Sequence, residues 1–244
     1  MCAVMGMLRS ELLRFFSGYS FLGVLGFSIL IPWFVSNFLG WPSTAGGLTV
    51  VENARIFWAL AATMAIVSVF AGSYVVSREA HYGTLKRSVV MCGLTRLVLI
   101  KYAAAVAVAL IVALAGTGLW AASLMLWSTP EARAGVLVPD AWRFLPGVLL
   151  ASVLGGVWGC SLGWIIRHYY ATTVAAMLVP LAVELPLLAN SSEVARWLPS
   201  GALAGISSVP FEGLLPPIQA SLVFLAWIAL SGIGAVLVLG RKEL

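Results

Sequence analysis

The chain has 244 residues, of which 61% are hydrophobic and only 9% are charged, and its mean hydropathy is +1.03. About a quarter of the residues in a soluble domain are normally charged, so this composition excludes a soluble globular protein. The formal net charge of +5 does not indicate nucleic-acid binding, because the basic residues flank long apolar runs, as they do in membrane proteins. Three cysteines stand far apart without a CxxC pair, so neither a disulfide framework nor a metal site is expected. The sequence therefore predicts an integral membrane protein.

Residues 1–16 predict a helix that lies along the inner surface of the membrane, with apolar side chains on one face and polar ones opposite. An irregular cytoplasmic extension is the alternative. The charges follow a short apolar run, which reverses the order found in a signal peptide, so no cleavage is expected. The apolar residues that can share one face at helical spacing are Met5, Leu8, Leu12, Leu13 and Phe16.

Six apolar runs are long enough to cross about 30 Å of hydrocarbon as helices, which takes about 20 residues each. The runs are continuous rather than alternating, so they predict helices and not the strands of a membrane barrel. We therefore expect an all-α fold with one transmembrane domain over residues 1–244. The predicted spans are Gly18–Leu39, Ile56–Val76, Tyr102–Trp127, Phe144–Ile166, Ala171–Ala189 and Ile218–Leu239.

The distribution of basic residues predicts the orientation of the spans. An even number of spans places both termini on one side. With the termini in the cytoplasm, ten Lys and Arg residues lie inside and four lie outside, as the positive-inside rule requires. We therefore expect a multi-pass protein of the inner (cytoplasmic) membrane with both termini in the cytoplasm. The four external basic residues are Arg55, Arg133, Arg143 and Arg196.

The segment Ser77–Lys101 carries most of the functional signal. It has five basic residues and one acidic residue, a balance of +4 that is nearly the whole formal charge of the chain. Thr84 is a favourable helix N-cap and Gly93 a favourable stop, which predicts a helix over Leu85–Cys92, and Thr95 is expected to cap the third span. A helix of two turns is too short to be stable alone in water.

Two settings can hold this short helix, and the physical chemistry of the segment leaves both open. The apolar side, with Leu85 and Val89, can dock into a groove on a cytoplasmic partner. Alternatively, the helix lies on the inner leaflet, where each basic side chain is attracted to anionic lipid by about 1 kcal/mol. The basic residues concerned are Lys86, Arg87, Arg96 and Lys101.

The same segment contains a series of short motifs, namely Arg78-Glu79, Gly83-Thr84-Leu85, Leu94-Thr95-Arg96 and Lys101. This series resembles the first cytoplasmic loop of ABC-2 type permeases, the membrane subunits of a class of ABC exporters. That family also has six spans, an N-terminal interfacial helix and re-entrant helices before the last span. The short chain resembles its peptide and lantibiotic-immunity branch. His81-Tyr82 stand where many relatives have a second acidic residue, so the motif assigns no substrate.

The resemblance implies a coupling helix at Leu85–Cys92 that transmits movement of a separate cytoplasmic ATPase to the spans. It also implies a second permease, identical or different, and export of an amphipathic peptide, lipid-like or drug-like substrate. This chain would need no cofactor, because ATP and magnesium would be bound by the ATPase subunit. Membrane lipid is a further expected partner, and nucleic acid is not. The residues expected to contact or couple to the ATPase are Glu79, Gly83, Thr84, Leu85, Lys86, Arg87, Val89, Arg96 and Lys101.

Glu184 is the one ionisable residue within the predicted spans, near the external end of the fifth. A carboxylate in lipid costs several kcal/mol, so we expect it to line a substrate path or to hold the segment that follows. The alternative is a carboxylate that only reaches water at the outer face or a backbone amide of a broken helix. The following segment, Asn190–Pro217, is rich in apolar residues and proline, which predicts short re-entrant helices.

Enzyme activity in this chain is not expected. The sequence has no GxxxxGK[ST] loop to hold nucleotide phosphates. Ser161 stands among glycines, but a serine nucleophile within the membrane needs a histidine in a span, and His81 and His168 lie outside the spans. The main alternative to an ABC exporter is an ATP-independent carrier or channel, or an accessory subunit of another membrane complex.

Four glycines of the fourth predicted span are spaced for close packing of helices, either within the bundle or between two permeases. They are Gly155, Gly156, Gly159 and Gly163.

Overall fold

The computed structural model describes residues 2–41, 47–209 and 213–241, and these residues form helices and connecting turns without a strand. The α-helices on the N-terminal side are α1 Cys2–Phe16, α2 Tyr19–Phe38, α3 Val50–Ala61, α4 Met64–His81, α5 Leu85–Cys92, α6 Leu94–Trp127 and α7 Pro130–Val136. A 3₁₀ helix at Pro139–Phe144 and two π-helical turns at Val174–Leu178 and Pro180–Glu184 interrupt the second half. The remaining α-helices are α8 Leu145–Ile166, α9 Tyr169–Thr173, α10 Leu185–Asn190, α11 Ser192–Ala195, α12 Pro199–Ile206 and α13 Pro217–Arg241.

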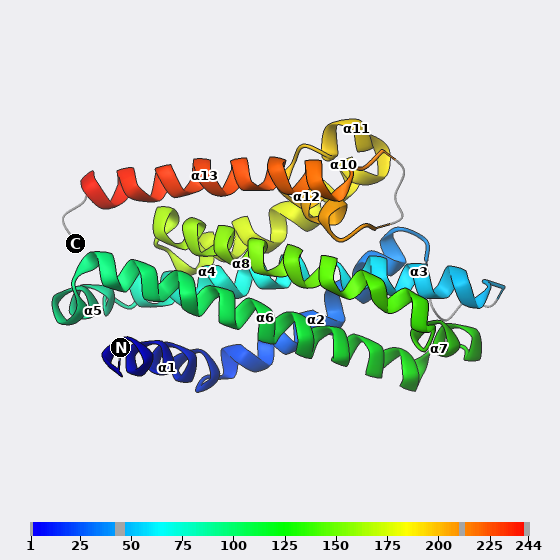
Figure 1. The fold of residues 1–244 in the computed structure, drawn as a ribbon, viewed down its shortest axis with the longest axis horizontal. Helices are drawn as coiled ribbons and strands as arrows, with labels where there is room; N and C mark the ends of the chain where they lie inside the picture. The colour runs from blue at the N-terminus through cyan, green and yellow to red at the C-terminus, as the bar shows by residue number, and fades with distance from the viewer. Residues whose placement is uncertain (1, 42–46, 210–212, 242–244) are drawn as a thin grey trace.

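The prediction of six spans is confirmed, because six helical segments of the described chain are long and apolar enough to cross a membrane. Five of them extend beyond the predicted limits, and the second and third do so by the most residues. The second extends over Val50–His81, with a break between α3 and α4, and the third begins at Leu94 rather than Tyr102. The sequence limits were drawn at the charged residues, whereas a helix continues through charges that find partners. The architecture is that of a multi-pass helical membrane protein (Figure 1).

Helix α4 is the most deeply buried span and packs most extensively against α8, then against α6 (Figure 1). The predicted glycine face of α8 makes this contact possible. A Cβ atom added at Gly159 would lie 2.0 Å from the carbonyl oxygen of Val69, and one at Gly72 would lie 2.1 Å from the carbonyl oxygen of Gly156. Because these glycines are enclosed by α4 and α6, they serve packing within the bundle, and the alternative of a contact between permeases does not apply to them.

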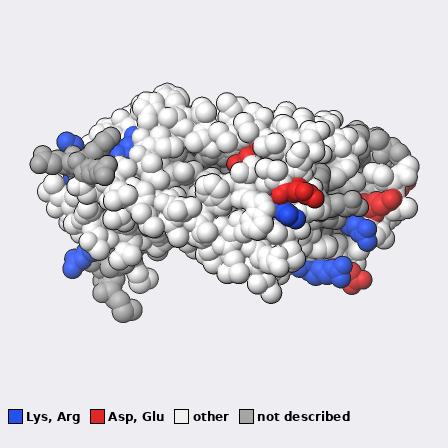
Figure 2. All heavy atoms as spheres, turned by 90° about the horizontal axis from the view of Figure 1, so that it is seen from above, with Lys and Arg blue, Asp and Glu red and all other residues white. Residues whose placement is uncertain are grey.

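The two ends of the bundle differ in character. Helix α5 lies at the same end of the bundle as the start of α1 and the end of α13, whereas α3, α7, α10 and α11 lie at the opposite end (Figure 1). We call these the α5 end and the far end. On the face shown in Figure 2, basic side chains stand at the α5 end on the left, both signs of charge occur in the right half, and a broad uncharged band lies between. This band is the surface expected for contact with hydrocarbon.

Candidate functional site at the α5 end

The predicted helix at Leu85–Cys92 is confirmed with these bounds, as helix α5. The turns on either side depend on glycine, because Gly83 has φ +70° and Gly93 has φ +76°, a region in which side chains are strained. Thr84 is the N-cap residue of α5, as predicted, but its hydroxyl makes no capping hydrogen bond and donates instead to the carbonyl oxygen of Glu79 at 3.4 Å. The predicted cap at Thr95 is wrong, because α6 begins at Leu94, directly after the Gly93 turn, and Thr95 lies inside the helix.

The apolar side of α5 packs against the protein's own bundle. Leu85 is only 4% exposed and packs in a cluster that includes Val76, Leu97 and Trp164, with Val89 partly buried against it. This placement corrects the expectation that the apolar side docks into a groove on a partner. The groove that receives Leu85 belongs to the same chain, and burial of this side chain is what holds so short a helix in place.

The other residues of α5 point in two further directions, as a rotation of about 100° per residue requires. Arg87 and Met91, one turn apart, line a cavity between α1, α4 and α5, and we call them the cavity face. Lys86 and Val90, also one turn apart, lie on neither the bundle side nor the cavity side, and we call them the outer face. Val90 is 86% exposed, which is unusual for an apolar side chain on a polar segment.

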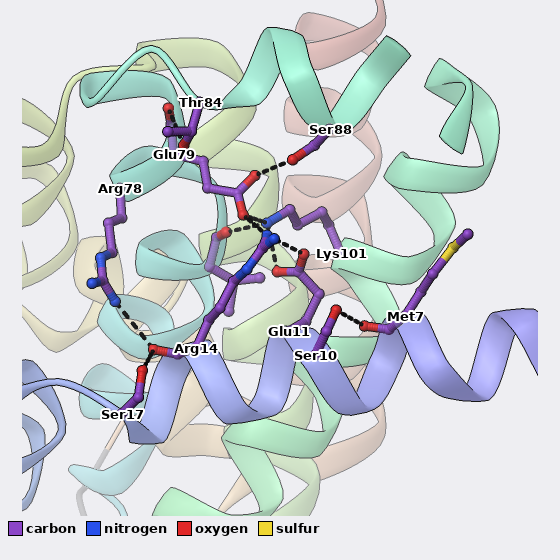
Figure 3. A network of polar contacts seen from close by, with 11 residues as sticks. Met7, Ser10, Glu11, Arg14, Ser17, Arg78, Glu79, Thr84, Ser88 and Lys101 are labelled. Carbon is purple, nitrogen blue, oxygen red and sulfur yellow. Dashed lines mark hydrogen bonds and ion pairs between the residues drawn. The ribbon is translucent and has the colours of Figure 1, made fainter. Parts of the chain in front are cut away.

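Beneath α5 lies a buried ionic network that joins four helices (Figure 3). The ammonium group of Lys101 on α6 is fully buried and donates to Glu11 Oε2 of α1 at 2.6 Å and to the carbonyl oxygen of Val75 at 2.9 Å. It also lies 3.0 Å from Glu79 Oε1 of α4. An ammonium group has three donors, and these three acceptors satisfy all of them.

Two further side chains complete the network. Nη1 of Arg14 on α1 lies 2.6 Å from Glu79 Oε1 and 3.2 Å from Glu11 Oε1. The hydroxyl of Ser88 on α5 donates to Glu79 Oε2 at 3.2 Å. Glu79 therefore contacts α1, α5 and α6 at once, and the two cations and two carboxylates are electrically balanced. A balanced and fully hydrogen-bonded group is the form in which charges are tolerated away from water.

Several residues that were predicted to contact the ATPase or lipid lie at the α5 end, but two of them, Glu79 and Lys101, are buried in the ionic network. Glu79 and Lys101 meet in the network, so their charges are satisfied inside the protein. Lys101 contacts neither lipid nor a partner in this arrangement, which corrects its expected place at the surface. Lys86, Arg87 and Arg96 are exposed, and among the described residues none of the three has an ion-pair partner.

Glu11 and Arg14 were not predicted as site residues. The apolar face expected for residues 1–16 is confirmed in part, because Leu8, Leu12 and Phe16 pack against the core, whereas Met5 and Leu13 are exposed. Among the described side chains of α1, the best buried are Glu11 and Phe15. Glu11 stands three residues after Leu8 and four before Phe15, a spacing that places all three on one face of a helix. An acidic residue in phase with apolar neighbours was the available signal of a buried carboxylate.

At the far end, Glu184 is buried at the end of the second π-helical turn, as part of a small apolar cavity of about 70 Å³. Its Oε2 accepts a hydrogen bond of 2.7 Å from the backbone N–H of Ser200 in the first turn of α12. The first N–H groups of a helix have no partner within it, so this carboxylate satisfies one of them and lies at the positive end of the helix dipole. Pro210, which belongs to the predicted re-entrant segment, lies outside the described residues.

Glu184→Ala is expected to lower the free energy of unfolding by about 1–3 kcal/mol, because it leaves the N–H of Ser200 without its acceptor. Glu184→Gln should cost less, since an amide oxygen can still accept this hydrogen bond. The measurement is SDS-induced unfolding in mixed micelles. Glu193→Ala, at an exposed acidic residue of α11, is the control. If the two alanine variants lowered the free energy of unfolding equally, Glu184 would not hold α12 in place.

The described hydrogen-bond partners of Ser161 include neither histidine. The hydroxyl of Ser161 is 2.8 Å from the Tyr102 hydroxyl and also donates to the carbonyl oxygen of Val157. His81 is the last residue of α4 and of the second span, which corrects its predicted place outside the spans. It packs against His168, two residues after the end of α8, with ring centroids 4.9 Å apart. Within the described part of the chain, no group of three or more His, Cys, Asp or Glu side chains is arranged to hold a metal ion.

Comparisons with known proteins do not assign this chain to a family. A search against protein-family models finds no match, and a search of curated proteins finds none. Fold and site together define a multi-pass helical membrane protein with a buried ionic network at the end that carries α5.

Proposed function

We propose that the chain is the membrane subunit of an ABC-2 type exporter, and that it works as a dimer with a separate cytoplasmic ATPase. In this proposal the α5 end faces the cytoplasm, α5 is the coupling helix, and α1 lies along the inner leaflet. The substrate is an amphipathic peptide, lipid-like or drug-like molecule. The sequence motifs from Arg78 to Lys101 and the six-span architecture support this proposal.

The observation that carries the proposal is the position of α5 above the ionic network. Ser88 links α5 to Glu79, and Glu79 is linked in turn to α1 and α6. A movement of α5 would therefore reach three other helices through the hydrogen bond of Ser88 and the ion pairs of Glu79. Such a connection suits a helix that receives a mechanical input from an ATPase.

The outer face of α5, Lys86 and Val90, is the surface that this proposal assigns to the ATPase. Val90→Asp should lower the ATPase that co-purifies with the chain by at least about ten-fold, because an aspartate at an apolar contact costs more than about 1.4 kcal/mol. Purification in mild detergent with an ATP hydrolysis assay gives the measurement. The control is Val194→Asp, the same change at an exposed valine of α11. If both variants retained the ATPase equally, the outer face of α5 would not be the surface that contacts the ATPase.

At the far end, we propose that α11 and α12 form the re-entrant segment before the last span. Buried residues of α12, among them Ala202 and Leu203, and its packing against α8 and α13 support this placement. The hydrogen bond from Ser200 to Glu184 would hold α12 to the fifth span. In this proposal the substrate path would be closed where α12 meets the fifth span.

A second candidate is an ATP-independent carrier, and one observation favours it. Ion-coupled carriers need buried ionisable groups, and the structure buries Lys101, Glu11 and Glu79 in addition to Glu184. The network is balanced and lies at one end of the bundle rather than midway along the spans, which favours a structural part for these groups. Transport that persists in cells depleted of ATP would favour the carrier.

A further inference from the structure

The cavity between α1, α4 and α5 has a volume of about 630 Å³ and brings together three arginines from three helices. Arg14 comes from α1, Arg78 from α4 and Arg87 from the cavity face of α5. Helices far apart in the sequence thus converge on one polar space at the α5 end.

The charge of the cavity is positive once its internal pairs are counted. Arg14 and Lys101 balance the carboxylates of Glu11 and Glu79, as the ionic network shows. Arg78 and Arg87 have no ion-pair partner among the described residues, so the cavity is left with a balance of +2. A ligand that complements it must be an anion.

The guanidinium groups also keep unused donors. The contacts of Arg14 to the two carboxylates both use Nη1, and its side chain is 57% exposed. Arg78 uses Nη1 to donate to the carbonyl oxygen of Arg14, as Figure 3 shows, and stacks over the ring of Tyr74. A guanidinium has five N–H donors in a planar fork, and this geometry matches the oxygens of a phosphate group.

Part of the cavity wall is apolar. Phe15 of α1, Tyr74 of α4 and Met91 of α5 line it, and Met91 is 72% exposed. An anion with an apolar portion fits such a space better than a fully polar one.

We propose that this cavity binds a phosphate group, held by Arg14, Arg78 and Arg87 and carried by the headgroup of an anionic phospholipid. A free phosphate compound shares this chemistry and is the other possible source. The proposal stands apart from the ATPase contact, because it uses the cavity face of α5 and not the outer face with Lys86 and Val90.

Native mass spectrometry of the full chain, with any subunit that co-purifies, tests the proposal. The probes are phosphatidylglycerol and phosphatidylcholine, whose choline cation a positive cavity disfavours, and in a parallel arm radiolabelled inorganic phosphate. The wild-type chain should bind phosphatidylglycerol at least about ten-fold more tightly than phosphatidylcholine. The variant Arg78→Gln/Arg87→Gln should lose this preference. Its matched control is Arg9→Gln/Arg55→Gln, which removes two exposed arginines that do not line the cavity.

The outcomes distinguish a phospholipid headgroup from a free phosphate compound as the ligand. Selective loss of phosphatidylglycerol binding in Arg78→Gln/Arg87→Gln supports a lipid headgroup, and selective loss of inorganic phosphate binding alone supports a free phosphate compound. Equal losses in the control variant, or no binding of either probe by the wild type, would overturn the site. So would an acidic segment of a partner protein found bound there instead. If the double variant does not fold, Arg87→Gln alone decides, because Arg87 is exposed, and unchanged binding in it contradicts the proposal.

Discussion

Replacing Lys101 with methionine is expected to destabilise the protein by about 3–5 kcal/mol, the usual cost of breaking a buried ion pair. Methionine fills a similar volume, but it leaves Glu11 without its closest partner and Glu79 with Arg14 and Ser88 alone. Unfolding by SDS in mixed micelles measures the loss. Glu11→Gln/Lys101→Met should recover part of it, because it removes one stranded carboxylate together with the cation.

The control for this prediction is Lys86→Met, which makes the same change at an exposed lysine of α5. Exposed charges typically contribute less than about 1 kcal/mol, so Lys86→Met should leave the free energy of unfolding almost unchanged. If Lys101→Met and Lys86→Met were equally stable, the ionic network would not contribute to holding α1, α4 and α6 together.

Gly159→Val is expected to prevent accumulation of the folded protein. Its Cβ atom alone would lie 2.0 Å from a backbone oxygen of α4, and backbone cannot move aside without separating α8 from the central helix. Gly159→Ala should show a smaller defect of the same kind. Fluorescence-detected size-exclusion chromatography of detergent extracts measures the folded fraction.

Gly118→Val supplies the matched control, because Gly118 also lies within a span and an added Cβ there meets no atom within 4 Å. This variant should accumulate at a level close to that of the wild type. Equal yields of Gly159→Val and Gly118→Val would contradict the close approach of α4 and α8.

The sequence was sufficient to predict the elements that depend on local chemistry. Continuous apolar runs predict spans because a helix needs about 20 such residues to cross the hydrocarbon, and the six spans are present. Helix α5 was predicted with its observed bounds, since glycine at positions 83 and 93 permits the turns on both sides. The close packing of Gly159 and its neighbours on α8 was also predicted, although not which helix they contact.

The features that depend on distant residues could not be predicted in the same way. Glu11 and Lys101 are 90 positions apart, and no local pattern pairs them. Leu85 was assigned to a partner because a short amphipathic helix gives no indication of which protein covers its apolar side. The two π-helical turns before α10 were not predicted either, because π-helical turns are rare and have no simple sequence pattern.

The most direct test of the proposed function is purification of the wild-type chain from its native membrane in mild detergent, with identification of whatever accompanies it. We expect a separate polypeptide with a GxxxxGK[ST] loop in equal amount, together with ATP hydrolysis that depends on Val90. A chain that purifies alone and without ATPase activity, under conditions that keep other membrane complexes intact, would contradict the exporter and favour the ATP-independent carrier.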